Sequence, residues 1–217
     1  MQKKIIVNPF FEFKHFTTDI QCGDMKDASQ REAFLLLHGI KRADLVLAGQ
    51  VHSSNVKVVT KNDRGSLIDN CDGLITAEKS LTLGIFTADC MPVLMASKCG
   101  QVKAAVHAGW RGLAAGILEK TAELFKSGFG INPEDIKVYI APHIQECCYE
   151  VGSDFGDNFG IKLANNKFDL SKTARNILIK CGLKSVQVSH FCTVCDKDSR
   201  FFSYRKNKTL KRQITVI

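Results

Sequence analysis

The sequence lacks any apolar run of the roughly 20 residues that a helix needs to cross a bilayer, so we expect no contact with a membrane. Its N-terminus, MQKKIIVNPF, lacks the long apolar core of a signal peptide, which favours a cytoplasmic protein. The sequence also contains no internal repeat, low-complexity tract or linker. We therefore expect one domain over residues 1–217, a length that buries roughly 70% of the unfolded surface without crosslinks.

Disulfide bonds are not expected, although the chain contains nine cysteines. The number is odd, and several cysteines lie within apolar runs. Cys147 and Cys148 are adjacent, and a bridge between neighbours closes a strained ring. His190, Cys192 and Cys195 follow the pattern H-x-C-x-x-C, which could be half of a structural zinc site. The other half would have to be Cys147 and Cys148, a poor pair, so we expect packed thiols and no second zinc.

Positive charge is in excess, with a formal net charge of +8. The excess is concentrated between residues 197 and 212, where Asp198 is the single acidic residue. Nucleic-acid interfaces combine such charge with interleaved aromatics and a recognition motif, and no such motif accompanies this segment. We therefore expect no nucleic-acid partner, and a solvated face with one or two residues aimed at a small anion. The basic residues are Lys197, Arg200, Arg205, Lys206, Lys208, Lys211 and Arg212.

Two good metal ligands stand just beyond the ends of two apolar runs. Leu81–Phe86 and Gln101–Val106 are predicted to be short buried strands, and Cys90 and His107 follow them. Strand ends are where functional sites are commonly built. Asp72, which precedes Gly73, is predicted to be a turn residue, with a carboxylate near this site as the alternative.

A third ligand candidate is His52, which follows the apolar run Leu45–Ala48. Two imidazoles and one thiolate suit Zn²⁺, and three protein ligands leave a position open, as in catalytic zinc sites. The spacing matches no local zinc-finger pattern, so ordinary half-buried Cys and His side chains remain the alternative. The candidate metal ligands are His52, Cys90 and His107.

Small residues follow His107, in the stretch Ala108-Gly109-Trp110-Arg111-Gly112. Small residues let the backbone approach a ligand closely, and the predicted helix after them has an N-terminus that favours anions. A cation-binding and an anion-binding feature are therefore expected side by side.

Several phrases in a fixed order resemble a known family: QVHSSNV (50–56), TADCMPVL (87–94), VHAGWRGLAAGIL (106–118), APHIQECCYEVG (141–152) and FFSYRKN (201–207). They are similar to the YfiH-like family, described as multicopper polyphenol oxidoreductase or laccase-domain proteins and as purine nucleoside phosphorylases. The resemblance implies one zinc ion on the three candidate ligands. The chain departs from the family at Ser53, Gln145 and Glu146, where Gly, Gly and Pro are usual. These departures affect the expected shape of the pocket wall more than the expected metal site.

The predicted elements alternate irregularly, which favours an α+β fold with mixed sheets. The resemblance implies an αββα sandwich, also similar to bacterial deamidating toxins that use a Cys and His pair. Cys90 could therefore be a nucleophile activated by His107, whereas a zinc-bound thiolate is not free to attack. Predicted helices include Gln30–His38, Leu113–Phe125, Val151–Phe159 and Ser171–Cys181. Predicted strands include Leu45–His52 and Asn55–Val59, which bracket Ser53-Ser54, and two strands that close the sheet, Phe201–Tyr204 and Ile214–Ile217.

The resemblance implies a zinc-dependent enzyme that splits adenosine or inosine with phosphate, with methylthioadenosine as a further candidate substrate. Deamination of adenosine is a further candidate reaction, because zinc lowers the pKa of a water that could attack the purine. The predicted catalytic residues are Cys90, His107 and Arg111. Phosphate is expected to bind Arg111 and Arg205, since guanidinium groups bind phosphate. The resemblance suggests that the loop after Ile140 lines the substrate pocket, with Tyr149 or Glu150 near the ligand.

Two other classes of function are weighed against this reading. A laccase needs a mononuclear and a trinuclear copper site with about ten histidines, and the chain has six; copper stays the alternative metal. A binding protein without turnover, which would use the basic C-terminal segment on RNA, needs neither the metal ligands nor the HAGWRG phrase. We expect a monomer or a weak homodimer.

Overall fold

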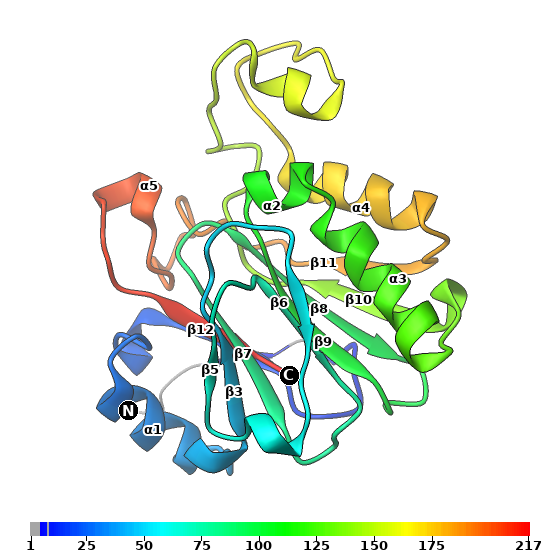
Figure 1. The fold of residues 1–217 in the computed structure, drawn as a ribbon. Helices are drawn as coiled ribbons and strands as arrows, with labels where there is room; N and C mark the ends of the chain where they lie inside the picture. Colours follow the sequence, from blue (N-terminus) through cyan, green and yellow to red (C-terminus); the bar gives the residue numbers. More distant parts are fainter. Residues whose placement is uncertain (1–4, 8) are drawn as a thin grey trace.

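The computed structural model describes residues 5–7 and 9–217, whose strands form two six-stranded sheets (Figure 1). The first sheet contains β1 (Ile5–Ile6), β2 (Phe16–Thr18), β3 (Leu45–Ala48), β5 (Leu67–Ile68), β7 (Thr82–Thr87) and β12 (Gln213–Val216). The second contains β4 (Val56–Val58), β6 (Gly73–Thr76), β8 (Met91–Ser97), β9 (Lys103–Ala108), β10 (Ile136–Ile140) and β11 (Ser185–Val188). The strand orders are β1-β2-β12-β7-β3-β5 and β11-β10-β8-β9-β6-β4. Each sheet combines parallel and antiparallel pairs, such as β3 with β7 and β12 with β7, which confirms the predicted α+β class.

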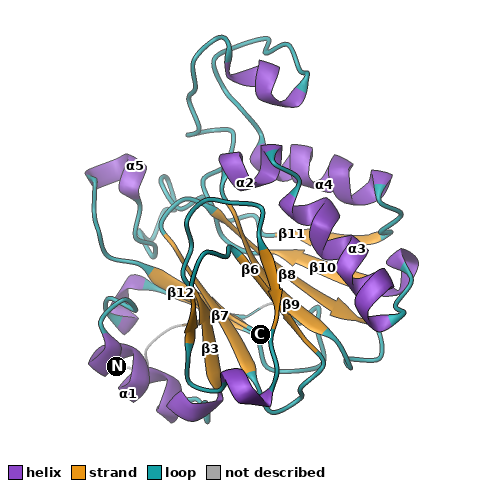
Figure 2. Cartoon of the chain, in the orientation of Figure 1, coloured by secondary structure: helices purple, strands orange, loops and turns teal. Residues whose placement is uncertain are grey.

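Helices cover the outer face of each sheet (Figure 2). Helix α1 (Ala28–Leu37) packs Phe34 and Leu35 on the first sheet. Helices α3 (Ile117–Phe129) and α4 (Leu170–Lys180) pack on the second sheet. The layers are therefore helix, sheet, sheet, helix, as the family resemblance implies.

Strand β8 shows how the sequence builds the second sheet. All seven of its residues are buried, because one face meets helices and the other meets the first sheet. Met91, Val93 and Met95 point toward the helical side. Leu94 and Ala96 point into the layer between the sheets, as the two-residue period of a strand requires.

Some predicted helices are confirmed and others are altered. Helices α1 and α4 match the predicted ranges to within two residues at each end. The predicted helix over Leu113–Phe125 is divided into α2 (Trp110–Ala114) and α3, because Gly116 adopts a left-handed conformation with φ of 82°. Only a 3₁₀ helix over Phe155–Phe159 forms in the predicted helix at Val151–Phe159.

Two predictions about strands are wrong. Residues 201–203 form no strand; Ser203 caps helix α5 (Tyr204–Asn207) by accepting a hydrogen bond from the Lys206 amide at 3.1 Å. β3 and β4 are also not neighbours around Ser53-Ser54, since they belong to different sheets. Residues 49–55 therefore cross from one sheet to the other, and this crossing segment carries His52.

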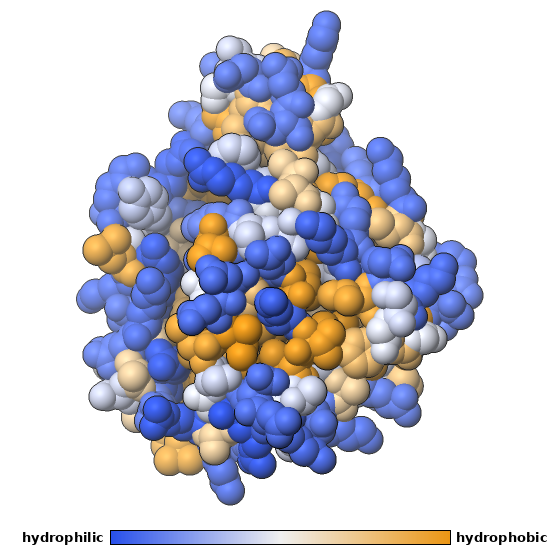
Figure 3. Space-filling model, in the orientation of Figure 1, coloured by the Kyte–Doolittle hydropathy of each residue, from blue (hydrophilic) through white to orange (hydrophobic). Residues whose placement is uncertain are grey.

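The face drawn in Figure 3 is mostly hydrophilic, with apolar residues gathered in a band across its middle. Exposed large apolar side chains of the described residues include Val58 and Leu67, on the edge strands β4 and β5. No helix in the described part of the chain has both the length and the apolar character to cross a membrane. Apolar exposure at these positions therefore belongs to sheet edges.

Candidate metal centre and active site

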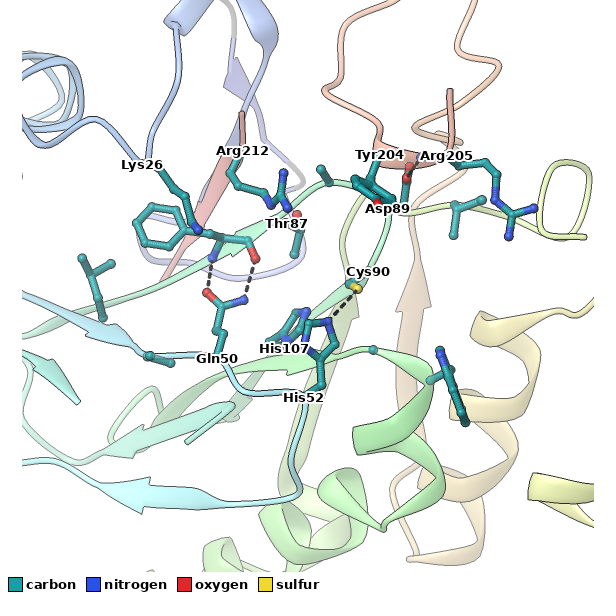
Figure 4. Close-up of a pocket in the computed structure, with 18 of the residues that line it drawn as sticks. Lys26, Gln50, His52, Thr87, Asp89, Cys90, His107, Tyr204, Arg205 and Arg212 are labelled. Atoms are coloured by element: carbon teal, nitrogen blue, oxygen red, sulfur yellow. Dashed lines mark hydrogen bonds between the residues drawn. The ribbon is translucent and has the colours of Figure 1, made fainter. Parts of the chain in front are cut away.

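The predicted ligands His52, Cys90 and His107 meet where the crossing segment approaches the ends of β8 and β9 (Figure 4). Cys90 Sγ lies 4.0 Å from His52 Nε2. The two imidazole rings lie 4.9 Å apart, nearly at right angles. One donor atom from each residue lies within 4.8 Å of the others, which is a spacing that a single ion can close with small side-chain movements.

Asp72 fixes the orientation of His107. The Nδ1 atom of His107 lies 2.8 Å from Asp72 Oδ1, and both side chains are buried. With the Nδ1 proton donated to the carboxylate, Nε2 is left as the ligand atom, as in carboxylate–histidine–zinc arrangements. Burial acts to raise the pKa of Asp72, but hydrogen bonds from His107 and Ser53 outweigh it and lower that pKa to about 2.

The same carboxylate holds the crossing segment. It accepts hydrogen bonds from the amides of Val51, His52 and Ser53 at 2.7 to 3.1 Å, and from the Ser53 hydroxyl at 2.8 Å. His52 has φ of 61°, which is unfavourable for a residue other than glycine. Asp72 therefore stabilises the strained backbone at His52 while it orients His107, and the Ser53 hydroxyl adds one further hydrogen bond to this carboxylate.

Gln50 attaches the beginning of the crossing segment to β7. Its side-chain amide pairs with the backbone of Phe86, donating to the carbonyl at 2.6 Å and accepting from the amide at 2.7 Å. Gln50 also has a positive φ, of 49°. Two side chains, Gln50 and Asp72, thus determine where His52 stands.

Cys90 and His107 perturb each other's protonation. Burial acts to raise the pKa of Cys90, but hydrogen bonds from His107 and His52 outweigh it and lower the pKa to about 6. Burial acts to lower the pKa of His107, but hydrogen bonds to Asp72 and Cys90 raise it to about 9. Cys90 is therefore a thiolate at neutral pH, the form in which a cysteine binds a metal or attacks an electrophile.

Gly109 leaves the space that the three ligands need. A Cβ at this position would lie 3.2 Å from His52 Cδ2 and 3.4 Å from Cys90 Sγ. We expect Gly109→Ala to weaken zinc binding by about tenfold, within the range found when the surroundings of metal ligands are altered. Competition with a chromogenic chelator measures the change. Gly128→Ala is the control, since its Cβ would meet nothing within 4 Å, and equal zinc affinity in both variants would contradict the crowding.

A cavity of about 960 Å³ opens beside the three ligands, within the size range of small-molecule sites. Its wall combines aromatic rings with cations. The aromatic residues are Phe86, Trp110, Tyr149 and Tyr204, and the basic residues are Lys26, Arg31, Arg205, Lys208 and Arg212. Three of these cations come from the basic C-terminal segment, so more of that segment faces the cavity than the one or two residues predicted.

Arg205 and Tyr149, both predicted substrate-binding residues, lie together in the cavity wall. The Arg205 guanidinium stands 5.6 Å from the Tyr149 ring centroid and donates to the Glu150 carbonyl at 2.9 Å. Burial, with the negative charge of Cys90 adding to it, raises the pKa of Tyr149 to about 12. The phenol therefore stays protonated and can donate a hydrogen bond to a ligand.

Asp89 connects three parts of this wall. Its carboxylate accepts hydrogen bonds from the Arg205 amide at 2.6 Å and from the Thr193 hydroxyl at 2.7 Å. It precedes Cys90 and has φ of 96°. Nothing in the local sequence indicates this role, because the partners lie more than 100 residues further along the chain.

Two further side chains differ in their access to the cavity. The Arg111 guanidinium is exposed, lies 4.5 Å from the Trp110 ring centroid, and is not among the cavity-lining residues. Its catalytic role stays a prediction.

Thr87, which was not predicted, lines the cavity, and its buried hydroxyl has no hydrogen-bond partner within the described residues. That hydroxyl is available to a ligand.

A second cysteine group corrects the prediction that Cys147 and Cys148 are poorly placed to join Cys192 and Cys195. The four sulfur atoms of these cysteines all lie within 4.8 Å of one another. No disulfide joins the nine cysteines, all of which the structure describes as free thiols. His190 is not part of this group; its ring contacts Phe191 at 3.9 Å.

The family model described as multi-copper polyphenol oxidoreductase laccase matches residues 9–217. Purine nucleoside phosphorylase YfiH of Escherichia coli K12 is 31% identical over 208 residues, which cover 90% of this chain and 83% of that protein. A purine nucleoside phosphorylase of Aquifex aeolicus is 37% identical over 165 residues, covering 74% and 77% respectively. The structure of YlmD from Geobacillus stearothermophilus aligns with a TM-score of 0.87 at 27% identity, covering 97% and 93%. The chain therefore belongs to the multi-copper polyphenol oxidoreductase laccase family of YfiH-like proteins.

Proposed function

We propose that this protein is a zinc-dependent purine nucleoside phosphorylase acting on adenosine or inosine. The observation that carries the proposal is one cavity in which a Cys and two His donors stand beside aromatic rings and five cations. Relatives at about 30% identity that bear this activity in their names support the same reaction. A cavity with these surfaces suits a ligand that is part aromatic base and part anion.

The donor set fits zinc better than the copper sites of a laccase. Among the described residues, the His-containing group has two histidines and one cysteine, which suits a single ion and not a trinuclear copper cluster. Asp72 holds His107 by Nδ1, which directs Nε2 toward Cys90, and Gly109 leaves room beside the donors. When bound by His52, Cys90 and His107, zinc supplies a Lewis acid at this wall of the cavity.

Phosphorolysis transfers ribose from the base to phosphate. An oxygen of phosphate forms a bond to C1′, the C1′–N9 bond breaks, and its electron pair leaves with the purine, which takes up a proton. Positive charge develops on the ribose during this exchange. Arg205 and Lys208 can hold the phosphate dianion, while Trp110 and Tyr149 offer faces for stacking the purine. The free Thr87 hydroxyl can bind a ribose or phosphate oxygen.

The decisive experiment is product detection with and without phosphate. Purified protein is incubated with adenosine or inosine, and free base and ribose 1-phosphate are separated by chromatography. We expect both products only when phosphate is supplied. Inosine and ammonia from adenosine would establish the proposed deaminase activity, and methylthioadenosine is tested in parallel. Absence of nucleoside cleavage, together with phenol oxidation after copper loading, would replace the proposal with an oxidase.

Substitution of the arginines should separate the two predicted phosphate ligands. We expect Arg205→Ala to lower kcat/KM for phosphorolysis by a hundredfold or more, because losing one donor at developing charge costs about 3 kcal/mol. Arg111→Ala should have a smaller effect, since its guanidinium lies on Trp110 outside the cavity lining. Steady-state kinetics in phosphate and nucleoside measure both. A larger effect at Arg111 would return it to the primary phosphate role, and zinc content should stay unchanged in both variants.

A second candidate is a Cys and His hydrolase, favoured by the chain Cys90, His107 and Asp72. The thiolate, the imidazole and the buried carboxylate are arranged as in nucleophilic triads. Alkylation distinguishes the readings. Rapid, stoichiometric labelling of Cys90 by iodoacetamide in protein with its full zinc content would favour the nucleophile, whereas protection of Cys90 by zinc favours the ligand.

We propose that the protein acts as one domain and as a monomer or weak homodimer in the cytoplasm, on small molecules and not on RNA. The basic C-terminal segment supports the choice of a small molecule over RNA, because Arg205, Lys208 and Arg212 face the cavity. Light scattering measures the mass in solution. Salt-dependent binding of single-stranded RNA at micromolar concentration would overturn the exclusion of nucleic acid.

A further inference from the structure

Four cysteines from two distant loops form a cluster on the wall beside the cavity. Cys147 and Cys148 follow β10, and Cys192 and Cys195 follow β11. The sulfurs of Cys147 and Cys195 are 3.5 Å apart, and all four lie within 4.8 Å of one another. Cys192 is buried while Cys147 and Cys195 are exposed, so the cluster is anchored in the fold and open to solvent.

Local backbone geometry makes the adjacent cysteines compatible with one centre. The amides of Cys148 and Tyr149 both donate to the Gln145 carbonyl at 2.9 Å, which is a helix-like turn. Successive side chains on such a turn diverge by about 100°, in contrast to the opposite directions of a strand. Both thiols can therefore approach the same point, although their adjacency in the sequence made them look like a poor pair of ligands.

The two loops are held to each other by backbone contacts independent of the sulfurs. His143 and Cys192 form an isolated β-bridge, and the Thr193 amide donates to the His143 carbonyl at 3.0 Å. The Gln145 amide points at Cys192 Sγ, at 3.5 Å. Amide donors to sulfur stabilise a thiolate, so the frame of a thiolate site is present before any ion binds.

We propose that Cys147, Cys148, Cys192 and Cys195 bind a second zinc ion as a closed structural site. Four thiolates are a common structural zinc set, and Zn–S bonds of about 2.3 Å in a tetrahedron place the sulfurs about 3.8 Å apart. The observed spacing brackets that value.

This second site supports the wall of the cavity. Tyr149 follows Cys148 directly, and Thr193 lies between Cys192 and Cys195. Thr193 donates to Asp89, which accepts from the Arg205 amide, while Arg205 reaches back to the Glu150 carbonyl. An ion at the four cysteines would therefore fix the relative position of Tyr149 and Arg205, whatever reaction the cavity performs.

Cobalt binding tests the site in the intact chain. In a His52→Ala variant, which lacks one ligand of the first site, the reduced protein is titrated with Co²⁺ in the absence of oxygen. We expect one tightly bound Co²⁺ with intense thiolate-to-metal charge-transfer bands and the visible bands of tetrahedral coordination, both removed by one equivalent of Zn²⁺. Because charge-transfer intensity grows with the number of thiolates, four sulfurs are distinguished from Cys90 alone.

Matched cysteine variants keep the test decisive. Cys195→Ser in the same background should lose the tetrathiolate spectrum, whereas Cys99→Ser, at an exposed thiol outside both groups, should retain it. Circular dichroism checks folding, and if Cys195→Ser does not fold, the titration of the chain with all four cysteines decides.

Metal analysis of the wild type should find two zinc ions per chain. Thiol counting after denaturation with a chelator, in protein quenched from cells without reductant, should find nine thiols. Absence of the spectrum, or a Cys147–Cys195 disulfide in quenched protein, would overturn the second site. Phosphorolysis by the wild-type protein is measured in a separate assay, so failure of the second site is distinguishable from failure of the proposed function.

Discussion

Alanine at Cys90 is expected to leave the first metal site empty and to abolish most of the nucleoside cleavage. The thiolate is one of only three donors, and two imidazoles at the end of a strand and on a crossing segment hold zinc poorly without it. Elemental analysis should show one zinc ion fewer per chain. We expect phosphorolysis to fall by roughly a hundredfold to a thousandfold, the range for losing a group that stabilises developing charge.

His52→Ala and His107→Ala should reproduce the loss of metal, while Cys99→Ala should not, because Cys99 lies outside the site. Zinc content equal to wild type in all three ligand variants would remove the ligand assignment. Activity that survives with the first site empty would separate phosphorolysis from the metal and leave the cations and aromatic rings of the cavity as its source.

Replacing Asp72 by alanine is expected to destabilise the protein itself. Its carboxylate is fully buried, accepts three backbone amides and the Ser53 hydroxyl, and pairs with His107. Removing one partner of a buried charged network leaves the others without their acceptor, which costs about 3 to 5 kcal/mol. Urea unfolding of metal-free protein measures this loss without a contribution from zinc.

Asp72→Ala should also lower zinc affinity, by about 10- to 100-fold, because His107 loses the acceptor that fixes its tautomer and His52 loses the amide contact that fixes its backbone. Asp69→Ala is the matched control, since Asp69 is an exposed acid close by in the chain. Equal unfolding free energies for the two variants would show that Asp72 acts as a turn residue only.

The sequence brought forward the three candidate metal ligands because each follows an apolar run, and functional sites are commonly built where buried strands end. Cys90, His107 and His52 can be found from the residues next to them in the chain, and the family phrases that contain them are specific. The mixed sheets and the helices α1 and α4 were predictable for the same reason, since burial imposes a period on the residues of each element.

Residues that act through partners distant in the chain were harder to predict from the sequence. Asp72 before Gly73 has the sequence of a turn, and its five hydrogen bonds go to residues that lie 19 to 35 positions away in the chain. The segment Phe201–Tyr204 has the aromatic composition of a strand, yet Ser203 caps a helix that begins at Tyr204, and Gln213–Val216 occupies the place beside β7. The local preference of residues 201–204 for a strand was overridden because β12, and not this segment, pairs with β7.

The sequence by itself determined the α+β class, the three donor residues and the surplus of cations near the C-terminus, because these depend on composition and on periods of a few residues. Only the tertiary structure decided that Arg205 and not Arg111 faces the cavity, that Asp89 ties Arg205 to Thr193, and that four cysteines meet at one point. Such relations depend on how two sheets pack and where their loops cross. A contact such as that between Cys147 and Cys195, which lie 48 positions apart, leaves no periodic trace in the chain, since its energy is realised only when the layers close.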